Sequence, residues 1–140
     1  MQCMKKLTFS YDDGVTQDTR LIELFNKYNV KATFNLNSGL LGRSGELVRE
    51  GKTVSHNKNK PEDIKYIYDG HEIAAHTLTH PLLTALSDEE VIRQVEEDRL
   101  KLSDLAGYEV VGMAYPGRKP NYDERCAKLI AQNTGVLYAR

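Results

Sequence analysis

Short apolar segments alternate along the chain with longer amphipathic ones. Between the short segments, apolar residues recur at intervals of three and four, which is the spacing of one helix face. Because strands and helices alternate, we expect an α/β fold with a parallel sheet and right-handed crossovers. The predicted strands, rich in apolar, aromatic or β-branched residues, span residues 6–11, 31–37, 70–76, 110–115 and 135–139.

The predicted helices have recognisable ends. The first begins near Thr16 or Asp18, since either side chain can accept hydrogen bonds from a first helical turn. The longest begins at Ser87, with Glu90 placed to complete a capping box, and ends before Gly107. The apolar stripe of the first helix consists of Leu21, Leu24, Phe25 and Tyr28.

Residues 40–69 show no clear period. A small hairpin is predicted over residues 46–55, and Pro61 favours the start of a short helix. His56 follows the hairpin. The favoured interpretation places it in a surface loop, and the alternative places it at the border of a cleft.

Composition narrows the class of protein. A chain of 140 residues with 40% hydrophobic and 28% charged residues predicts one globular domain. A net charge of −1 argues against nucleic acid or a polybasic membrane patch as partner, and no apolar run is long enough to span a bilayer. Cys3 and Cys126 lack metal-type spacing. Two isolated cysteines do not make a disulfide framework, which is compatible with a reducing compartment. No signal-like segment begins the sequence, so we expect a cytoplasmic location, although a secreted chain trimmed of its leader would look the same.

Polar residues follow four of the predicted strands. In parallel α/β folds the carboxyl ends of the strands meet at one rim, where chemistry collects. Two adjacent carboxylates repel each other, so a cation, hydrogen-bond donors or a catalytic role must offset the cost. The alternative for this pair is a polar Asp-Gly turn. The rim residues are Asp12 and Asp13, Asn35 and Asn37, His76 and His80, and Tyr115, Gly117 and Arg118.

His76 and His80 are four positions apart. On one helical turn, this spacing places two imidazoles on the same face, where they can share a metal ion. A lone histidine at such a place is more often a hydrogen-bonded core or loop residue, and the pair with this spacing favours neither interpretation. Together with a carboxylate on the same rim they favour a metal site, and three protein ligands leave coordination positions open for catalysis.

Three stretches resemble the motifs of one family. The sequences FSYDDG (9–14) and GHEIAAHTLTHP (70–81) resemble the first two motifs of the polysaccharide deacetylases, the NodB homology or carbohydrate esterase 4 family. The sequence YPG (115–117) is similar to the third motif in its looser form. The resemblance implies a partial, irregular (β/α) barrel of the NodB type. We therefore expect residues 1–140 to form one incomplete domain, in which the barrel stops after about five parallel strands.

The same resemblance implies roles for individual residues. The family removes acetyl groups from N-acetylated, or O-acetylated, sugars and polysaccharides by metal-assisted hydrolysis, so the expected partner is a carbohydrate. Asp12 would be the general base. A divalent metal, with Zn²⁺ favoured over Co²⁺, Ni²⁺ and Mn²⁺, would be held by Asp13, His76 and His80. Oxyanion or substrate contacts would come from Tyr115, Gly117 and Arg118.

The sequence also departs from the family pattern. Ala114 stands where the third motif often has an arginine that orients the base, and Arg118 either replaces it or is a solvated loop residue. Nothing matches the later motifs, which supply a catalytic histidine. Five strands do not close a barrel, so we expect either a fragment or a homo-oligomer that covers the open sheet edges.

Two other functions remain open. The first is an inactive, metal-binding domain of deacetylase ancestry that lacks the catalytic acid. The second is a signalling receiver domain, which also carries an Asp pair after its first strand. A receiver needs a phosphoacceptor Asp after the third strand, where this chain has His76.

Overall fold

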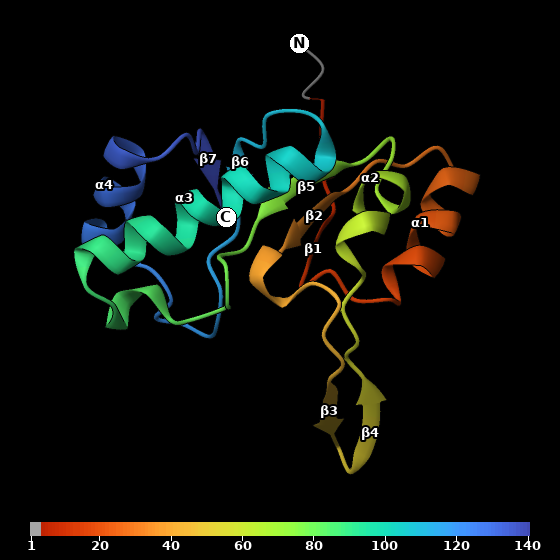
Figure 1. Ribbon diagram of the computed structural model, residues 1–140. Coiled ribbons are helices and arrows are strands. Elements are labelled where there is room, and N and C mark those ends of the chain that lie inside the picture. Colours follow the sequence, from red (N-terminus) through yellow and green to blue (C-terminus); the bar gives the residue numbers. More distant parts are fainter. Residues whose placement is uncertain (1–3) are drawn as a thin grey trace.

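The computed structural model describes residues 4–140, and in this part of the chain a parallel sheet curls into half of a barrel (Figure 1). The strand order is β1-β2-β5-β6-β7, so β1 and β7 form the edges. Every pairing in this sheet is parallel, which confirms the predicted α/β architecture. Its strands are β1 (Ser10–Asp12), β2 (Thr33–Leu36), β5 (Glu72–Ala75), β6 (Gly112–Met113) and β7 (Tyr138–Ala139).

Each strand is shorter than the apolar pattern predicts. Pairing of the first strand begins only where Ser10 lies beside Thr33, the first residue of β2. Just upstream, the Phe9 carbonyl accepts a single hydrogen bond from the Thr33 amide at 2.9 Å, and Leu7 is 80% exposed. An apolar segment therefore extends beyond the part that a partner strand holds in the sheet. Cys3 lies outside the described residues.

The helices of the described chain are α1 (Asp18–Lys27), α2 (Ile64–Ile67), α3 (Asp88–Ala106) and α4 (Glu124–Asn133), with short 3₁₀ turns η1 (Ser38–Leu40), η2 (Pro61–Asp63) and η3 (Leu83–Ala85). Ser87 caps α3, because its Oγ accepts a hydrogen bond from the Glu90 amide at 3.3 Å, and Gly107 ends the helix in a left-handed conformation. The Glu90 carboxylate pairs with Arg93 instead of completing the capping box. Among residues 4–140, no helix is both long and apolar enough to cross a bilayer.

The start of α1 differs from the prediction. Gln17 occupies the N-cap position and makes no side-chain capping bond. Asp18 is instead a buried first-turn residue that accepts a hydrogen bond from the Tyr68 hydroxyl at 2.7 Å. The buried face of α1 is also rotated from the predicted stripe: Ile22 is buried, whereas Leu24 and Tyr28 are exposed.

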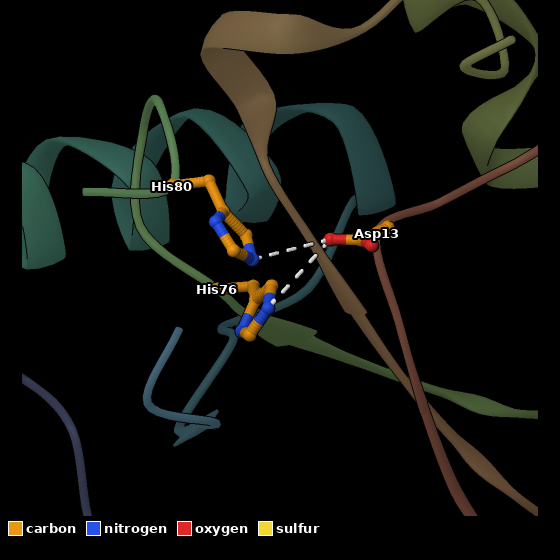
Figure 2. Close-up of side chains that lie close together, drawn as sticks. All are labelled: Asp13, His76 and His80. Carbon is orange, nitrogen blue, oxygen red and sulfur yellow. Dashed lines mark ion pairs between the residues drawn. The ribbon is translucent and has the colours of Figure 1, made fainter. Parts of the chain in front are cut away.

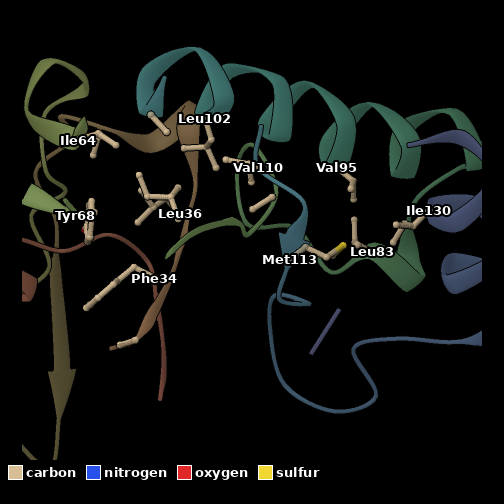
Figure 3. Close-up of a cluster of buried hydrophobic side chains, with 14 of the residues drawn as sticks. Phe34, Leu36, Ile64, Tyr68, Leu83, Val95, Leu102, Val110, Met113 and Ile130 are labelled. Atoms are coloured by element: carbon tan, nitrogen blue, oxygen red, sulfur yellow. The ribbon is translucent and has the colours of Figure 1, made fainter. Parts of the chain in front are cut away.

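The main hydrophobic core lies between the sheet and α3 (Figure 3). Phe34 and Leu36 are two positions apart on β2, so both side chains point to the face of the sheet that forms this core, and both are fully buried. Leu102 of α3 lies above Leu36, whereas Val95 of the same helix lies near Leu83 and Met113, and both are fully buried. Burial of each such side chain stabilises the fold by about 1.5–3 kcal/mol, which anchors the sheet under the helix.

The opposite face of the sheet carries polar residues. Ser10, Thr33, Asn35 and Glu72 line a cavity of about 450 Å³ together with residues of β6 and β7. The Tyr138 hydroxyl donates to Glu72 across this cavity. This hydrogen bond joins β7 to β5, which are separated by β6 in the sheet, as expected of a sheet that curls toward closure.

A two-stranded antiparallel hairpin projects away from the sheet (Figure 1). It consists of β3 (Glu46–Arg49) and β4 (Lys52–Ser55), which confirms the predicted hairpin. At its base, the His56 amide donates to the Gly45 carbonyl at 2.8 Å, and the Lys58 amide donates to the Arg43 carbonyl at 2.9 Å. The chain therefore returns from the hairpin directly to the rim of the sheet.

Candidate metal centre

Asp13, His76 and His80 lie together at the rim of the sheet (Figure 2). One potential ligand atom from each lies within 4.8 Å of the others. The Nε2 atoms of His76 and His80 are 3.7 and 3.5 Å from Oδ1 of Asp13. Asp13 follows β1, whereas both histidines follow β5, so the parallel sheet brings together residues more than 60 positions apart in the sequence.

The ring of His76 is held in one orientation. Its Nδ1 atom lies 2.8 Å from the Ala114 carbonyl oxygen, and a carbonyl can only accept, so Nδ1 carries the hydrogen. The Nε2 lone pair then faces Asp13. The side chain is only 2% exposed, and this burial lowers the pKa of His76. A neutral imidazole with a free Nε2 is the form that binds metals.

The backbone around His76 is fixed from two neighbouring elements. Asp98 of α3 is fully buried and accepts hydrogen bonds from the amides of Ser38 at 2.7 Å and His76 at 3.0 Å. Burial raises the pKa of Asp98 to about 7, although these two amides act in the opposite direction. Asn37 donates to the carbonyls of His76 and Thr77 at 2.5 and 2.9 Å. The end of β5 is therefore held on both sides.

The two histidines do not share a helical turn, so that part of the prediction is wrong. Thr77 and His80 have positive φ angles of 70° and 62°, and the segment between them is a loop. The Thr77 hydroxyl accepts a hydrogen bond from the His80 amide at 3.2 Å, which tightens the loop. The two imidazoles still meet edge to face, with ring centroids 4.9 Å apart. His80 is the outer member, with a side chain 36% exposed.

Two further basic side chains contact Asp13. His56 Nε2 lies 3.4 Å from Oδ2, and Lys58 Nζ lies 3.8 Å from Oδ1. The favoured interpretation of His56 as a surface-loop residue is therefore wrong, because the residue borders the cluster. Burial lowers the pKa of both His56 and Lys58. No periodicity marks this segment, and the sequence offered no signal for Lys58.

Asp12 faces a different set of partners. Arg140 Nη2 and Asn35 Nδ2 donate to the same oxygen, Oδ1, at 2.7 and 2.8 Å. Within residues 4–140, no side chain donates to Oδ2. Arg118, the predicted alternative partner of this carboxylate, is exposed and makes no ion pair within the described chain. The arginine beside Asp12 is therefore Arg140.

The three residues predicted to contact substrate follow β6 and come directly after Ala114, the residue whose carbonyl oxygen contacts His76. The Tyr115 ring packs against Tyr122 with centroids 5.7 Å apart, and its amide donates to the Arg140 carbonyl at 2.9 Å. Gly117 is exposed, with a φ of +87°. In the described chain, neither these residues nor Arg118 bonds to Asp13, His76 or His80. Their substrate roles remain predictions.

A family model described as polysaccharide deacetylase matches residues 2–139, which is nearly the whole sequence. The chain belongs to the polysaccharide deacetylase family. Among relatives, it is 27% identical over 107 residues to the Listeria monocytogenes peptidoglycan-N-acetylglucosamine deacetylase PgdA, covering 74% of this chain and 20% of that protein. It is 32% identical over 100 residues to chitin deacetylase 1 of Cryptococcus neoformans var. grubii, covering 70% of this chain and 18% of that one. The chain thus spans about one fifth of these relatives.

Solved structures of deacetylases share the fold. The Streptococcus pyogenes deacetylase PplD, solved with acetate, superposes with a TM-score of 0.74 and 21% identity over 96% of this chain and 56% of PplD. The Bacillus subtilis peptidoglycan deacetylase PdaC superposes with a TM-score of 0.69 and 22% identity over 99% of this chain and 59% of PdaC. These likenesses confirm the NodB-type half-barrel.

Proposed function

We propose that this chain carries the metal-binding centre and general base of a deacetylase that acts on polymers of N-acetylated amino sugars. The convergence of Asp13, His76 and His80 beside Asp12 carries this proposal. The substrate class is drawn from the relatives, since one is named for peptidoglycan N-acetylglucosamine and another for chitin. Both names share the N-acetyl group of an amino sugar in a polymer.

The donor set suits a divalent cation. Two imidazole nitrogens and one carboxylate oxygen are typical of catalytic zinc sites, where a fourth position stays open. Ligand atoms about 2.1 Å from a tetrahedral ion lie about 3.4 Å from each other. The separations of the two imidazole nitrogens from Asp13 Oδ1 are 3.5 and 3.7 Å, close to that value, and all three ligand atoms lie within 4.8 Å of one another. We therefore favour Zn²⁺, with Co²⁺, Ni²⁺ and Mn²⁺ as alternatives.

The remaining residues have distinct tasks in acetyl hydrolysis. A bound divalent cation would polarise the acetyl carbonyl and acidify a water molecule. Asp12 would accept a proton from the attacking water at Oδ2, because Oδ1 is already held by Arg140 and Asn35. Ala114 would keep His76 in its ligating tautomer.

Acetate release tests this function. The full chain, loaded with Zn²⁺, would be incubated with oligomers of N-acetylglucosamine, and free acetate would be measured. We expect release that requires metal and is lost in Asp12→Asn. An O-acetylated xylan serves as the second substrate and separates N- from O-deacetylation. If the chain binds metal and stays folded but releases no acetate from either substrate, the inactive metal-binding domain is the correct alternative.

A further inference from the structure

We propose that Lys58 is a positioning residue that holds Asp13 in place as a metal ligand. This inference rests on the proposed function, because it assumes that Asp13 binds the metal. Lys58 follows the β3–β4 hairpin, and its amino group reaches the turn that ends β1. The hairpin segment would thereby form part of the metal centre.

The turn at Asp13 needs support from outside. Asp13 has a φ of +83° and Gly14 a φ of +61°, so two successive residues lie in the left-handed region. Glycine adopts that conformation freely, whereas aspartate adopts it at a cost in free energy. A strained backbone of this kind persists only where surrounding contacts fix it.

Three successive carbonyl groups of this turn receive those contacts. The Asp13 carbonyl accepts from Lys58 Nζ at 2.7 Å, and the Gly14 carbonyl accepts from the Asn59 amide at 2.9 Å. The Val15 carbonyl accepts from Asn59 Nδ2 at 3.0 Å. Two adjacent residues of one segment thus bind every carbonyl from Asp13 to Val15. We call Lys58 and Asn59 the turn clamp.

Lys58 is unusual for a lysine in this position. Its side chain is only 8% exposed, so the ammonium group is largely shielded from solvent where it donates to the Asp13 carbonyl. The short distance is to the Asp13 backbone oxygen, whereas the carboxylate oxygen Oδ1 is 3.8 Å away. Nζ also lies 3.2 Å from Nε2 of His56. Lys58 therefore binds the backbone of Asp13, while the carboxylate of Asp13 faces the imidazoles of His76 and His80.

Two effects of Lys58 on metal affinity oppose each other. A lysine that acts only as a nearby positive charge repels a divalent cation, so its removal would tighten binding. A lysine that positions the ligand favours binding, so its removal would weaken it. Loss of groups that orient metal ligands typically weakens affinity on the order of tenfold to hundredfold. The direction of the change therefore separates the two roles.

The test compares Lys58→Met with Lys60→Met in the full chain. Met keeps most of the aliphatic stem of Lys58 but removes the ammonium group, and Lys60 is an exposed lysine two positions away. Zn²⁺ affinity would be measured by competition with a chromogenic chelator, and the Co²⁺ absorption spectrum would report ligand geometry. We expect Lys58→Met to weaken Zn²⁺ binding about tenfold to hundredfold and to change the Co²⁺ spectrum. Lys60→Met should leave both unchanged.

The outcomes separate this inference from the proposed function. If the unaltered chain binds no Zn²⁺, the proposed function and this inference both fail. If it binds Zn²⁺ and a folded Lys58→Met variant binds as tightly as Lys60→Met, or more tightly, only the role of Lys58 is wrong. Should Lys58→Met not fold, Lys58→Gln, which keeps an N–H donor without the charge, decides in its place. Because Gln keeps a donor for the Asp13 carbonyl but removes the charge, Zn²⁺ binding no tighter than that of Lys60→Met would then support the positioning role, and tighter binding would overturn it.

Discussion

Arg140 donates to Asp12 at 2.7 Å across 128 positions of the sequence. Asp12 ends β1 and Arg140 follows β7, so this pair connects the two edge strands of the half-barrel. Arg140 Nε also donates to Ser10 at 3.0 Å, which fixes the guanidinium at two points. The curl of the sheet thereby supplies an arginine to the proposed base.

Arg140→Met should lower kcat without unfolding the protein. Both side chains are more than one third exposed, so we expect the pair to contribute no more than about 1 kcal/mol to stability. A general base contributes about 10²- to 10⁴-fold to rate, and a misplaced one should lose at least about tenfold. Steady-state acetate release would show the fall in kcat with little change in KM. The matched control is Arg118→Met, and an equal loss in that variant would contradict the specific role of Arg140.

Removal of a ligand should abolish stable metal binding. We expect His76→Ala and Asp13→Ala to retain less than one equivalent of Zn²⁺ after dialysis, because two remaining ligands bind weakly. His71→Gln is the control: His71 is buried, and its ring bonds to the Ala32 amide and to Asn26 instead of the cluster. Metal content by mass spectrometry checks the result. Full Zn²⁺ content in a folded His76→Ala variant would show that the site is wrongly assigned.

Asp18→Asn should stabilise the protein at alkaline pH. Burial raises the pKa of Asp18 to about 6, above its unfolded value of about 3.9, so the folded state holds this proton more tightly. The free energy of unfolding therefore falls as the pH rises from about 4 to about 6, and remains lower above that range. Asn cannot ionise, so we expect Asp18→Asn to be more stable than the unaltered chain at pH 8, by up to about 3 kcal/mol.

The comparison isolates Asp18 from other titrating groups. Denaturant unfolding of metal-free protein at pH 4 and pH 8 would give the difference between Asp18→Asn and the unaltered chain at each pH. Asp69→Asn, at an exposed position, controls for the loss of a charge. A stability difference that is the same at both pH values would contradict this prediction.

Gly39→Ala should disturb the loop that runs from His76 to His80. A Cβ at this position would lie 2.6 Å from the Leu78 carbonyl oxygen, which also accepts a hydrogen bond from the Gly39 amide. Leu78 lies between the two histidines, so the clash pushes directly on their loop. We expect a loss of about 1–3 kcal/mol in stability and weaker Zn²⁺ binding. Native affinity together with native stability, from titration and thermal unfolding, would rule this out.

Much of the architecture was predictable because it depends on local patterns. The alternation of apolar strands and amphipathic helices is sufficient to predict a parallel sheet. Polar residues at the strand ends then predict which side chains meet, and Asp13, His76 and His80 do meet. Strand ends were less predictable, since the length of a strand depends on where its neighbour begins.

The supporting contacts could not be predicted, because they depend on long-range geometry. Lys58 reaches Asp13 from a segment without periodicity, and Arg140 reaches Asp12 only because the sheet curls. The sequence correctly predicted that His76 and His80 lie together, but the helical turn on which that prediction rested is absent from this segment. A spacing of four fits a helix face, but here a loop with two left-handed residues brings the rings together.

The hairpin has a consequence for how this domain can be altered. Its turn residues, Glu50 and Gly51, both have positive φ angles, as in the tight turns that close two-residue hairpins. All eight strand residues are exposed, whereas the base is tied to the rim through Lys58 and Asn59. The tip is therefore mechanically separate from the site. We expect that a fluorophore, an affinity tag or a few added residues at the tip would leave the positions of the metal ligands unchanged. The tip is therefore a suitable site for labelling this protein.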